Sequence, residues 1–287
     1  MEEVEHVLRV RCELGEGPVW RPDEQALYWT DILCKQIHRY EPGKGKHDVY
    51  ETGLPVGSFA FRSRGDFLVA AGNMLAYWRP GSYGVEVLHV FDEFSRDDRL
   101  NDGKVDSSGC FWTGSMCSGG GGHLYRLDVD GSIRVMESGI GISNGLGWSP
   151  DNLRMYYTDT MAHTIYVYDY DASRGTISNR RTFVHVPEEL GYPDGVAVDE
   201  QGFVWSAMWA GWKVIRFAPD GSVDRIVQMP VDKPTSCAFG GPGLDELYIT
   251  SAHRYRDTDQ RSAQTLAGDL FRVKAGVRGT PVQPFGG

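Results

Sequence analysis

The feature that most constrains the fold is a repeat of six similar segments along the 287 residues. Each segment opens with a short apolar strand, and these strands end 41 to 50 residues apart, at or near Trp20, Phe61, Val105, Trp148, Val198 and Phe239. A period in the forties that consists of strands throughout is typical of propeller blades with four strands each. The sequence therefore predicts an all-β fold, a six-bladed β-propeller with four-stranded antiparallel blades.

The other strands of each repeat follow at matching positions. Second strands with aromatic or β-branched centres and third strands with polar alternation are expected in all six repeats. Fourth strands are expected at 48–51, 85–91, 132–137, 181–186 and 223–229. The sixth repeat has little chain left for one, so we expect the leading segment, Val4 to Cys12, to close the last blade beside 270–273 and protect the exposed edges. One domain should span residues 1–287, with a single helical turn near 187–190.

Composition and charge narrow the classes of function. With 41% hydrophobic residues the chain can bury a large core, and its net charge of −10 disfavours nucleic acid and anionic membranes as partners. The acidic N-terminus lacks the pattern of a signal peptide, and no apolar run is long enough to cross a bilayer, so a cytoplasmic protein is expected. The five cysteines show no Cys-x-x-Cys spacing, which argues against structural disulfides and a zinc ribbon.

Six residues occupy equivalent positions in the six repeats, each four residues before the end of the first strand. In a propeller the innermost strands all begin at one end of the central channel, so these residues should form a ring. Carboxylate and amide oxygens dominate it, and such donors suit Ca²⁺, Mg²⁺ or Mn²⁺, with Zn²⁺ also compatible. The alternative is that the Asn-Gly and Asp-Gly pairs are ordinary turns, although a Glu between two glycines is an unusual turn residue. The six residues are Glu16, Gly57, Asn101, Asn144, Asp194 and Thr235.

Five motifs that occur in order along the chain carry a family resemblance. They are Leu-Gly-Glu-Gly-Pro-Val-Trp at 14–20, Arg-Leu-Asn-Asp-Gly-Lys-Val-Asp at 99–106, Ser-Asn-Gly at 143–145, Tyr-Pro-Asp-Gly at 192–195 and Thr-Ser-Cys-Ala-Phe-Gly-Gly at 235–241. Together they resemble the motifs of the SMP-30/gluconolactonase/regucalcin family over essentially the whole chain. The resemblance implies a six-bladed propeller and places this chain among relatives that include sugar lactonases dependent on a divalent metal ion.

The resemblance also implies roles for particular residues. Glu16, Asn144 and Asp194 match the family's metal ligands, and Arg99 and Asn101 match its pair of substrate-contacting residues. Family members often carry a Glu in the loop after a Gly-Thr-Met run. Here the run is Gly-Ser-Met at 114–116, followed by Cys-Ser-Gly-Gly-Gly-Gly without a Glu, so the wall that contacts the sugar should differ.

The leading functional interpretation is a lactonase that uses one divalent metal ion, Ca²⁺, Zn²⁺, Mn²⁺ or Mg²⁺, to open an aldono- or aldarolactone to the free acid. A bound metal polarises the carbonyl, and Asp194 would also take a proton from the attacking water. Arg99 would donate to substrate hydroxyls or a carboxylate, unless it pairs with Asp97 or Asp98 instead. Asn101 would hydrogen-bond a sugar hydroxyl or bind through metal-bound water.

Two alternatives remain open. One is a metal-dependent esterase or phosphotriesterase on the same scaffold, and the other is a non-catalytic propeller that binds calcium or a protein partner. The ring of acids favours a small-molecule site, since a partner-binding propeller has no need of carboxylates at its axis. Trp209 and Trp212 either form an apolar wall against a sugar or pack between blades.

Overall fold

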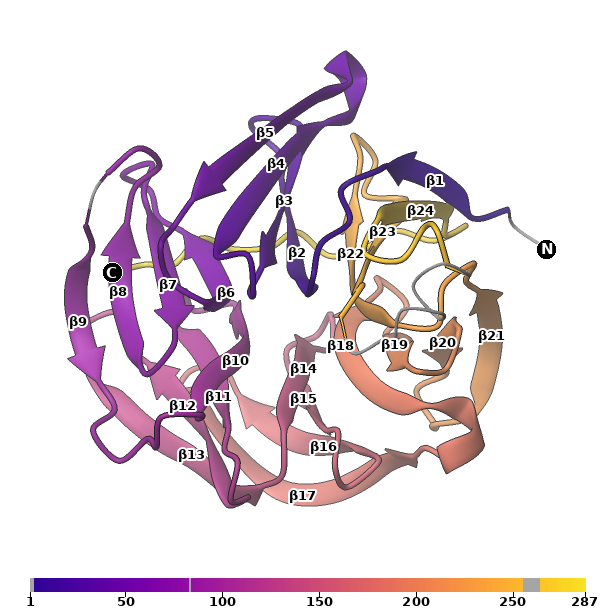
Figure 1. Cartoon of the computed structure of the whole chain (residues 1–287). Helices are drawn as coiled ribbons and strands as arrows, with labels where there is room; N and C mark the ends of the chain where they lie inside the picture. Colours follow the sequence, from indigo (N-terminus) through magenta and orange to yellow (C-terminus); the bar gives the residue numbers. More distant parts are fainter. Residues whose placement is uncertain (1–2, 83, 255–263) are drawn as a thin grey trace.

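The computed structural model describes residues 3–82, 84–254 and 264–287. Within these residues, 24 strands form six four-stranded antiparallel sheets that stand as blades around a central axis (Figure 1). Blades one to three contain β2 (Gly15–Arg21), β3 (Ala26–Asp31), β4 (Gln36–Glu41) and β5 (Lys46–Glu51); β6 (Val56–Phe61), β7 (Phe67–Ala71), β8 (Met74–Trp78) and β9 (Glu86–Val90); and β10 (Arg99–Val105), β11 (Phe111–Met116), β12 (Gly122–Leu127) and β13 (Ile133–Ile140).

Blades four and five repeat the pattern, and blade six takes one strand from the N-terminus. Their strands are β14 (Ser143–Trp148), β15 (Arg154–Asp159), β16 (Thr164–Asp171) and β17 (Thr176–His185); β18 (Tyr192–Val198), β19 (Val204–Trp209), β20 (Lys213–Phe217) and β21 (Val223–Gln228); and β22 (Pro234–Gly240), β23 (Glu246–Ser251), β24 (Leu270–Lys274) and β1 (Glu5–Leu8). The predicted fold class is therefore confirmed. The expected helical turn is a short 3₁₀ helix, Glu188–Leu190, and a second one spans Pro42–Lys44.

The closure of the ring is as predicted, although the closing strand is shorter than expected. β1 pairs antiparallel with β24, with Glu5 opposite Arg272 and Leu8 opposite Leu270. The strand ends at Leu8 and does not continue to Cys12, because the Asp269 carboxylate accepts the backbone N–H groups of the next turn, at positions 10 and 11, each over 2.9 Å. The first and last strands of the chain thus share one sheet, and the last blade has no missing strand.

Burial follows from the position of each strand within its blade. Every residue of β3 is buried because neighbouring blades cover both of its faces, whereas every residue of β9, at the outer edge, is exposed. An aspartate holds the hairpin between β18 and β19. Asp199 accepts the backbone N–H groups of Gln201 and Phe203 and the indole N–H of Trp205, which locks the Asp-Glu-Gln-Gly loop onto the second strand.

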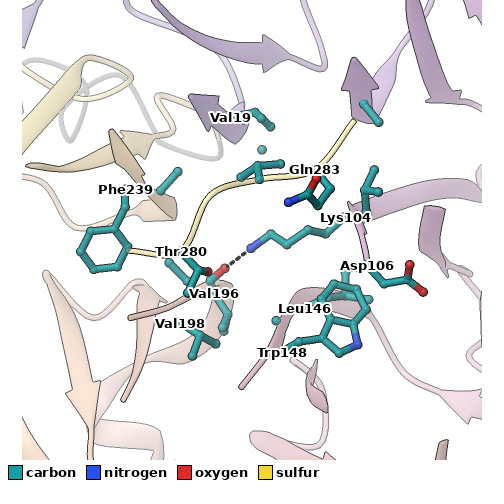
Figure 2. Close-up of a pocket in the computed structure, with 18 of the residues that line it drawn as sticks. Val19, Lys104, Asp106, Leu146, Trp148, Val196, Val198, Phe239, Thr280 and Gln283 are labelled. Carbon is teal, nitrogen blue, oxygen red and sulfur yellow. Dashed lines mark hydrogen bonds between the residues drawn. The ribbon is translucent and has the colours of Figure 1, made fainter. Parts of the chain in front are cut away.

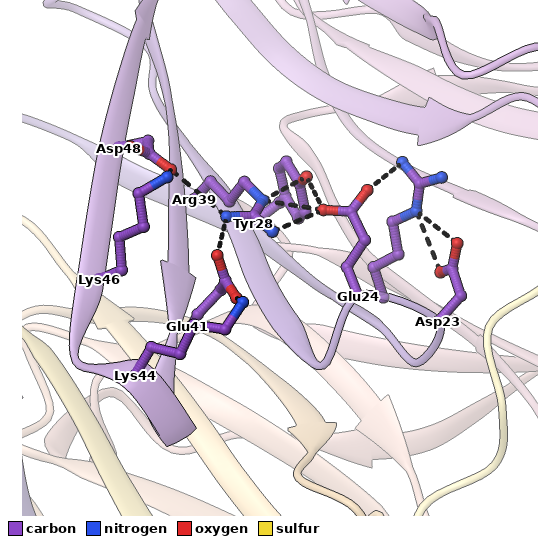
Figure 3. A network of polar contacts seen from close by, with 9 residues as sticks. Asp23, Glu24, Tyr28, Arg39, Glu41, Lys44, Lys46 and Asp48 are labelled. Atoms are coloured by element: carbon purple, nitrogen blue, oxygen red, sulfur yellow. Dashed lines mark hydrogen bonds and ion pairs between the residues drawn. The ribbon is translucent and has the colours of Figure 1, made fainter.

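The outer part of blade one is tied together by charged side chains (Figure 3). The Arg39 guanidinium contacts Glu24 at 2.8 Å, Glu41 at 2.6 Å and Asp48 at 3.3 Å, and so joins the β2–β3 hairpin to β4 and β5. Hydrogen bonds from Lys44 and Arg39 hold the pKa of Glu41 at about 2. The network holds β5 in place through Asp48, which directly follows His47 in that strand.

The residues after β24 cross the channel at the end opposite the ring of first positions. Gly279 forms a β-bridge with Asp199 of blade five, and the Phe285 N–H donates to the Phe61 carbonyl of blade two over 2.8 Å. The Phe285 side chain is buried. This C-terminal strap, residues 278–287, was not predicted. None of the helices in the described part of the chain is long and apolar enough to span a membrane.

Candidate metal and substrate site

The predicted ring residues lie at irregularities of the innermost strands. The register shifts between Glu16 and Val19 in β2 and between the corresponding positions of the other five inner strands. The Asn-Gly and Asp-Gly pairs therefore lie inside strands β14 and β18, and the alternative that they are loop turns is wrong. A Cβ on Gly145 would lie 2.5 Å from the Val196 nitrogen, so glycine there allows two inner strands to approach closely.

Five polar members of the ring are buried, and hydrogen bonds orient their side chains. Asn101 Nδ2 donates to Asn144 Oδ1 over 2.8 Å and to the Ser143 carbonyl over 2.7 Å. Asn144 Nδ2 donates to Thr160 Oγ1 over 2.8 Å, and this hydroxyl donates to the Pro193 carbonyl over 2.8 Å. These contacts fix the orientation of the Asn144 amide, with its nitrogen toward Thr160 and its oxygen toward Asn101 of the ring. The buried polar members are Glu16, Asn101, Asn144, Asp194 and Thr235.

Thr160 was missed by the sequence analysis. It follows the second strand of blade four and lies in no inner strand, so its position in the sequence does not mark it as part of the ring. The only signal in the sequence was its position directly after a strand with aromatic residues at its centre. Its role is to hold the Asn144 amide and the start of β18 at the same time.

Carboxylates dominate the electrostatics of the ring. Burial raises the pKa of Glu16 well above its usual value, and the Asp194 and Asp102 carboxylates raise it further. Burial and Asp102 likewise raise the pKa of Asp194. Among the described residues, Asp194 Oδ1 is buried and has no hydrogen-bond partner. A cation between buried carboxylates offsets their mutual repulsion and the cost of burying their charge.

The donor set fits a divalent metal ion. Two carboxylates and one oriented amide oxygen, supplied by Glu16, Asp194 and Asn144, are the ligand types that hard cations and zinc accept. The unpartnered Asp194 oxygen and the upward pKa shifts are what a cation at this place would relieve. The structure thus brings all three predicted ligands to one end of the channel.

Arg99 and Asn101 lie beside this donor set. Arg99 donates to Asn101 Oδ1 and to the Leu100 carbonyl, the latter over 3.1 Å, and its other terminal nitrogen lies 3.7 Å from Met116 Sδ. The two predicted substrate-contacting residues are therefore in direct contact. The loop after Met116 is anchored by the Asp98 carboxylate, which accepts the Ser118 N–H over 2.7 Å.

Asp102 and Lys104 lie below the ring, in a channel cavity of about 220 Å³ (Figure 2). Burial raises the pKa of Asp102 to about 6, partly offset by Lys104 and Arg99. Lys104 Nζ points across the channel and donates to the Val196 carbonyl over 2.9 Å. The strap residues Thr280 and Gln283 line the far side of this cavity. Both charged residues belong to the 99–106 motif, but the sequence did not show on which side of the ring they lie.

The two tryptophans near the fifth blade behave differently from one another. Trp209 packs against the small apolar cluster of Leu14, Ile32 and Ala252, and Lys233 Nζ lies 5.2 Å from its ring centre. Trp212 is 43% exposed. Packing therefore explains Trp209, whereas Trp212 is accessible at the surface.

Comparison with known proteins shows the family to which the chain belongs. The family model for the SMP-30/Gluconolactonase/LRE-like region matches residues 14–253. Pentonolactonase XacC of Haloferax volcanii is 41% identical over 97% of this chain and 96% of its own length. The 6-deoxy-6-sulfogluconolactonase of Pseudomonas putida is 36% identical over 100% and 99%.

A solved structure gives the same result at the level of the fold. The calcium-binding protein regucalcin of Agrobacterium tumefaciens superposes with a TM-score of 0.93 at 25% identity, covering 99% of this chain and 97% of that one. The matched family region includes all five motifs and all six inner strands of the propeller. This chain belongs to the SMP-30/gluconolactonase/LRE family.

Proposed function

We propose that this protein is a divalent-metal-dependent hydrolase that opens a sugar lactone to the free acid. The observation that carries the proposal is the buried donor set of Glu16, Asn144 and Asp194, in which one carboxylate oxygen has no partner among the described residues. Lactonases among the relatives, one acting on pentonolactones and one on a sulfogluconolactone by their names, support the reaction class.

A metal ion bound by Glu16, Asn144 and Asp194 would supply Lewis acidity that polarises the lactone carbonyl. Asp194 would receive a proton from the attacking water through its second oxygen, the role of a general base. Thr160 and Asn101 would hold the Asn144 amide in its ligating orientation through the hydrogen bonds described above.

Arg99 would position the substrate. Its guanidinium offers charge-assisted hydrogen bonds to a sugar hydroxyl or to an acidic substituent. Its contact with Asn101 Oδ1 would place the guanidinium donors beside the amide oxygen, which can accept a hydrogen bond from a sugar hydroxyl. The loop at 117–121, which lacks the family's Glu, would leave more room or different contacts on the opposite wall, so the preferred lactone should differ between relatives.

The test is a panel of neutral and acidic pentono- and hexonolactones, followed by acid release in a pH-indicator assay. We expect turnover with Ca²⁺, Zn²⁺, Mn²⁺ or Mg²⁺ that is lost with chelator and restored by metal. Glu16→Gln should lose both metal affinity and activity. Turnover of carboxylic esters or phosphate triesters, without turnover of any lactone, would favour an esterase or phosphotriesterase instead. Tight metal binding with no turnover of any ester would identify a non-catalytic calcium-binding propeller.

A further inference from the structure

A second group of metal-binding atoms lies in blade one, outside the ring. Cys12, Asp31 and His38 are all buried, and each offers one ligand atom within 4.8 Å of the others. Cys12 Sγ is 3.8 Å from His38 Nε2. On a tetrahedral zinc ion, bonds of about 2.3 Å to sulfur and about 2.0–2.1 Å to nitrogen place these two atoms roughly 3.6 Å apart. The sulfur and the imidazole are therefore spaced for a shared ion without a change of fold.

A second histidine lies behind the His38 ring, where it can support a metal ligand. His38 Nδ1 lies 3.0 Å from His47 Nε2, and the rings of Trp29, His38 and His47 stack. Burial lowers the pKa of His38 to about 4, so the ring is neutral at physiological pH. When Nδ1–H donates to His47, the lone pair of Nε2 is directed toward Cys12. A hydrogen bond of this kind behind the ring is the usual support of a metal-bound histidine.

Blade four provides an internal comparison, because it has the same aspartate without the other groups. Asp31 accepts the backbone N–H groups of residues 13, 14 and 34, and Asp159 accepts those of residues 141, 142 and 162. The aspartate therefore holds the backbone around it in the same way in both blades. Around it, blade four has Ile140, Ala162 and Tyr166 at the positions where blade one has Cys12, Cys34 and His38.

The residues of blade four show that apolar and aromatic side chains are enough to pack around this aspartate. Blade one has a thiol and an imidazole in place of Ile140 and Tyr166, around an aspartate whose Oδ2 accepts one backbone N–H at 2.8 Å and keeps a second lone pair. Thiolate, imidazole and carboxylate together suit zinc better than calcium or magnesium. The ligand set therefore differs in kind from the oxygen donors of the ring.

Cys34 lies at the solvent side of this group. It is exposed, and it is near enough to Asp31 and Cys12 to influence both electrostatically. Burial and Asp31 raise the pKa of Cys34 to about 11, and burial also raises the pKa of Cys12. Metal binding at Cys12 would release the thiol proton to solvent as the sulfur–metal bond forms, with no change of oxidation state.

We propose that Cys12, Asp31 and His38 form a second, zinc-type metal site. Cys12 lies in the segment that connects the closing strand β1 to β2, whereas Asp31 and His38 belong to β3 and β4. A metal ion here would clamp the closure of the propeller to the first blade. The site would be structural, and it does not depend on the proposed lactonase activity.

The experiment uses the full chain, reduced and stripped with chelator, and titrated with Co²⁺. Cobalt bound by a thiolate gives a sulfur-to-metal charge-transfer band in the near ultraviolet, which the all-oxygen ring cannot produce. We expect this band in the wild type and in Glu16→Gln, and its loss in Cys12→Val. Cys110→Val is the matched control, since Cys110 is also a buried thiol but contacts Arg126 and belongs to no group of potential metal ligands among the described residues. Absence of the band from the wild type, or its persistence in Cys12→Val, would overturn the proposal.

A second set of measurements covers the case in which Cys12→Val folds poorly. His47→Ala leaves the three protein ligands in place but removes the support of His38, and should weaken Zn²⁺ binding about 10–100-fold. Zinc affinity should also rise with pH by about tenfold per unit for each thiol proton released. Lactone turnover should be the same in His47→Ala as in the wild type. Unchanged zinc affinity in His47→Ala and a pH-independent affinity would each contradict the site.

Discussion

Asn101 Nδ2 donates to Asn144 Oδ1 over 2.8 Å, and this bond joins the inner strands of two neighbouring blades. One of the two residues is the proposed substrate contact and the other is a proposed metal ligand. Thr160 holds the opposite end of the Asn144 amide. The site is therefore assembled by bonds between blades, and changes at residues that touch neither metal nor substrate should alter it.

The first prediction concerns this orientation. Thr160→Val removes the acceptor for Asn144 Nδ2 and should weaken metal binding about 10–100-fold, because a ligand without its supporting bond loses its fixed geometry. Calorimetric titration of metal measures the effect. Thr158→Val is the control, since the Thr158 hydroxyl is buried without a partner in the described structure. Equal affinities for the two variants would show that Thr160 has no such role.

The second prediction separates ligation from proton transfer at Asp194. Asp194→Asn keeps an oxygen for the metal but loses the base and one negative charge. Hydrolysis should fall by about 10²-fold or more, even at saturating metal. Steady-state constants with metal titrated provide the measurement. Recovery of wild-type turnover at high metal would reduce Asp194 to a ligand only.

The third prediction concerns Arg99. Arg99→Ala should leave metal affinity nearly unchanged, because guanidinium is no ligand for a cation. It should weaken kcat/KM by about 1–3 kcal/mol, through loss of a charge-assisted hydrogen bond to substrate. The loss should be largest for lactones that carry an acidic group and small for neutral ones. A uniform loss across both kinds of lactone would argue that Arg99 acts only by holding Asn101.

The fourth prediction is a pH dependence of stability. Glu16, Asp194 and Asp102 all have raised pKa values in the folded, metal-free protein. Their contribution to stability is fully present below the unfolded-state pKa, 3.8 for Asp102, and is lost as pH rises through the folded value, about 6 for that residue.

We therefore expect the melting temperature of the metal-free protein to fall from about pH 4 to about pH 8, and saturating metal to restore it at the upper end. Scanning fluorimetry with chelator and with Ca²⁺ or Zn²⁺ measures both curves. Asp194→Asn should flatten the metal-free curve, since one of the three titrating groups is gone. A metal-free curve that rises across this range would contradict the electrostatic account of the ring.

The fifth prediction concerns the C-terminal strap. Phe285 is buried in the apolar cluster between blades two and three, so Phe285→Ala should lower the free energy of unfolding by about 3–5 kcal/mol. Pro281→Ala, an exposed residue of the same strap, should change it little. Urea denaturation measures both variants. Similar stabilities would show that the strap does not contribute to the core.

Much of the fold could be predicted because strand periodicity and repeat length are local properties of the chain. The phase of the repeat also identified Glu16, Asn144 and Asp194 as neighbours, since equivalent positions of the inner strands must meet at one end of the channel. The closing strand followed from a blade that lacked its fourth strand. Each of these conclusions needs only the order of residues along the chain and the rule that blades repeat.

Tertiary structure decided the contacts that do not repeat. Thr160, the pairing of Asn101 with Asn144, and the placement of Lys104 below the ring depend on which side chains face each other between blades. The path of Phe285 across the channel and the gathering of Cys12 with His38 likewise join residues whose spacing matches no period. Such contacts arise where the chain departs from its own repeat, so periodicity cannot reveal them, and only the packed blades bring those residues together.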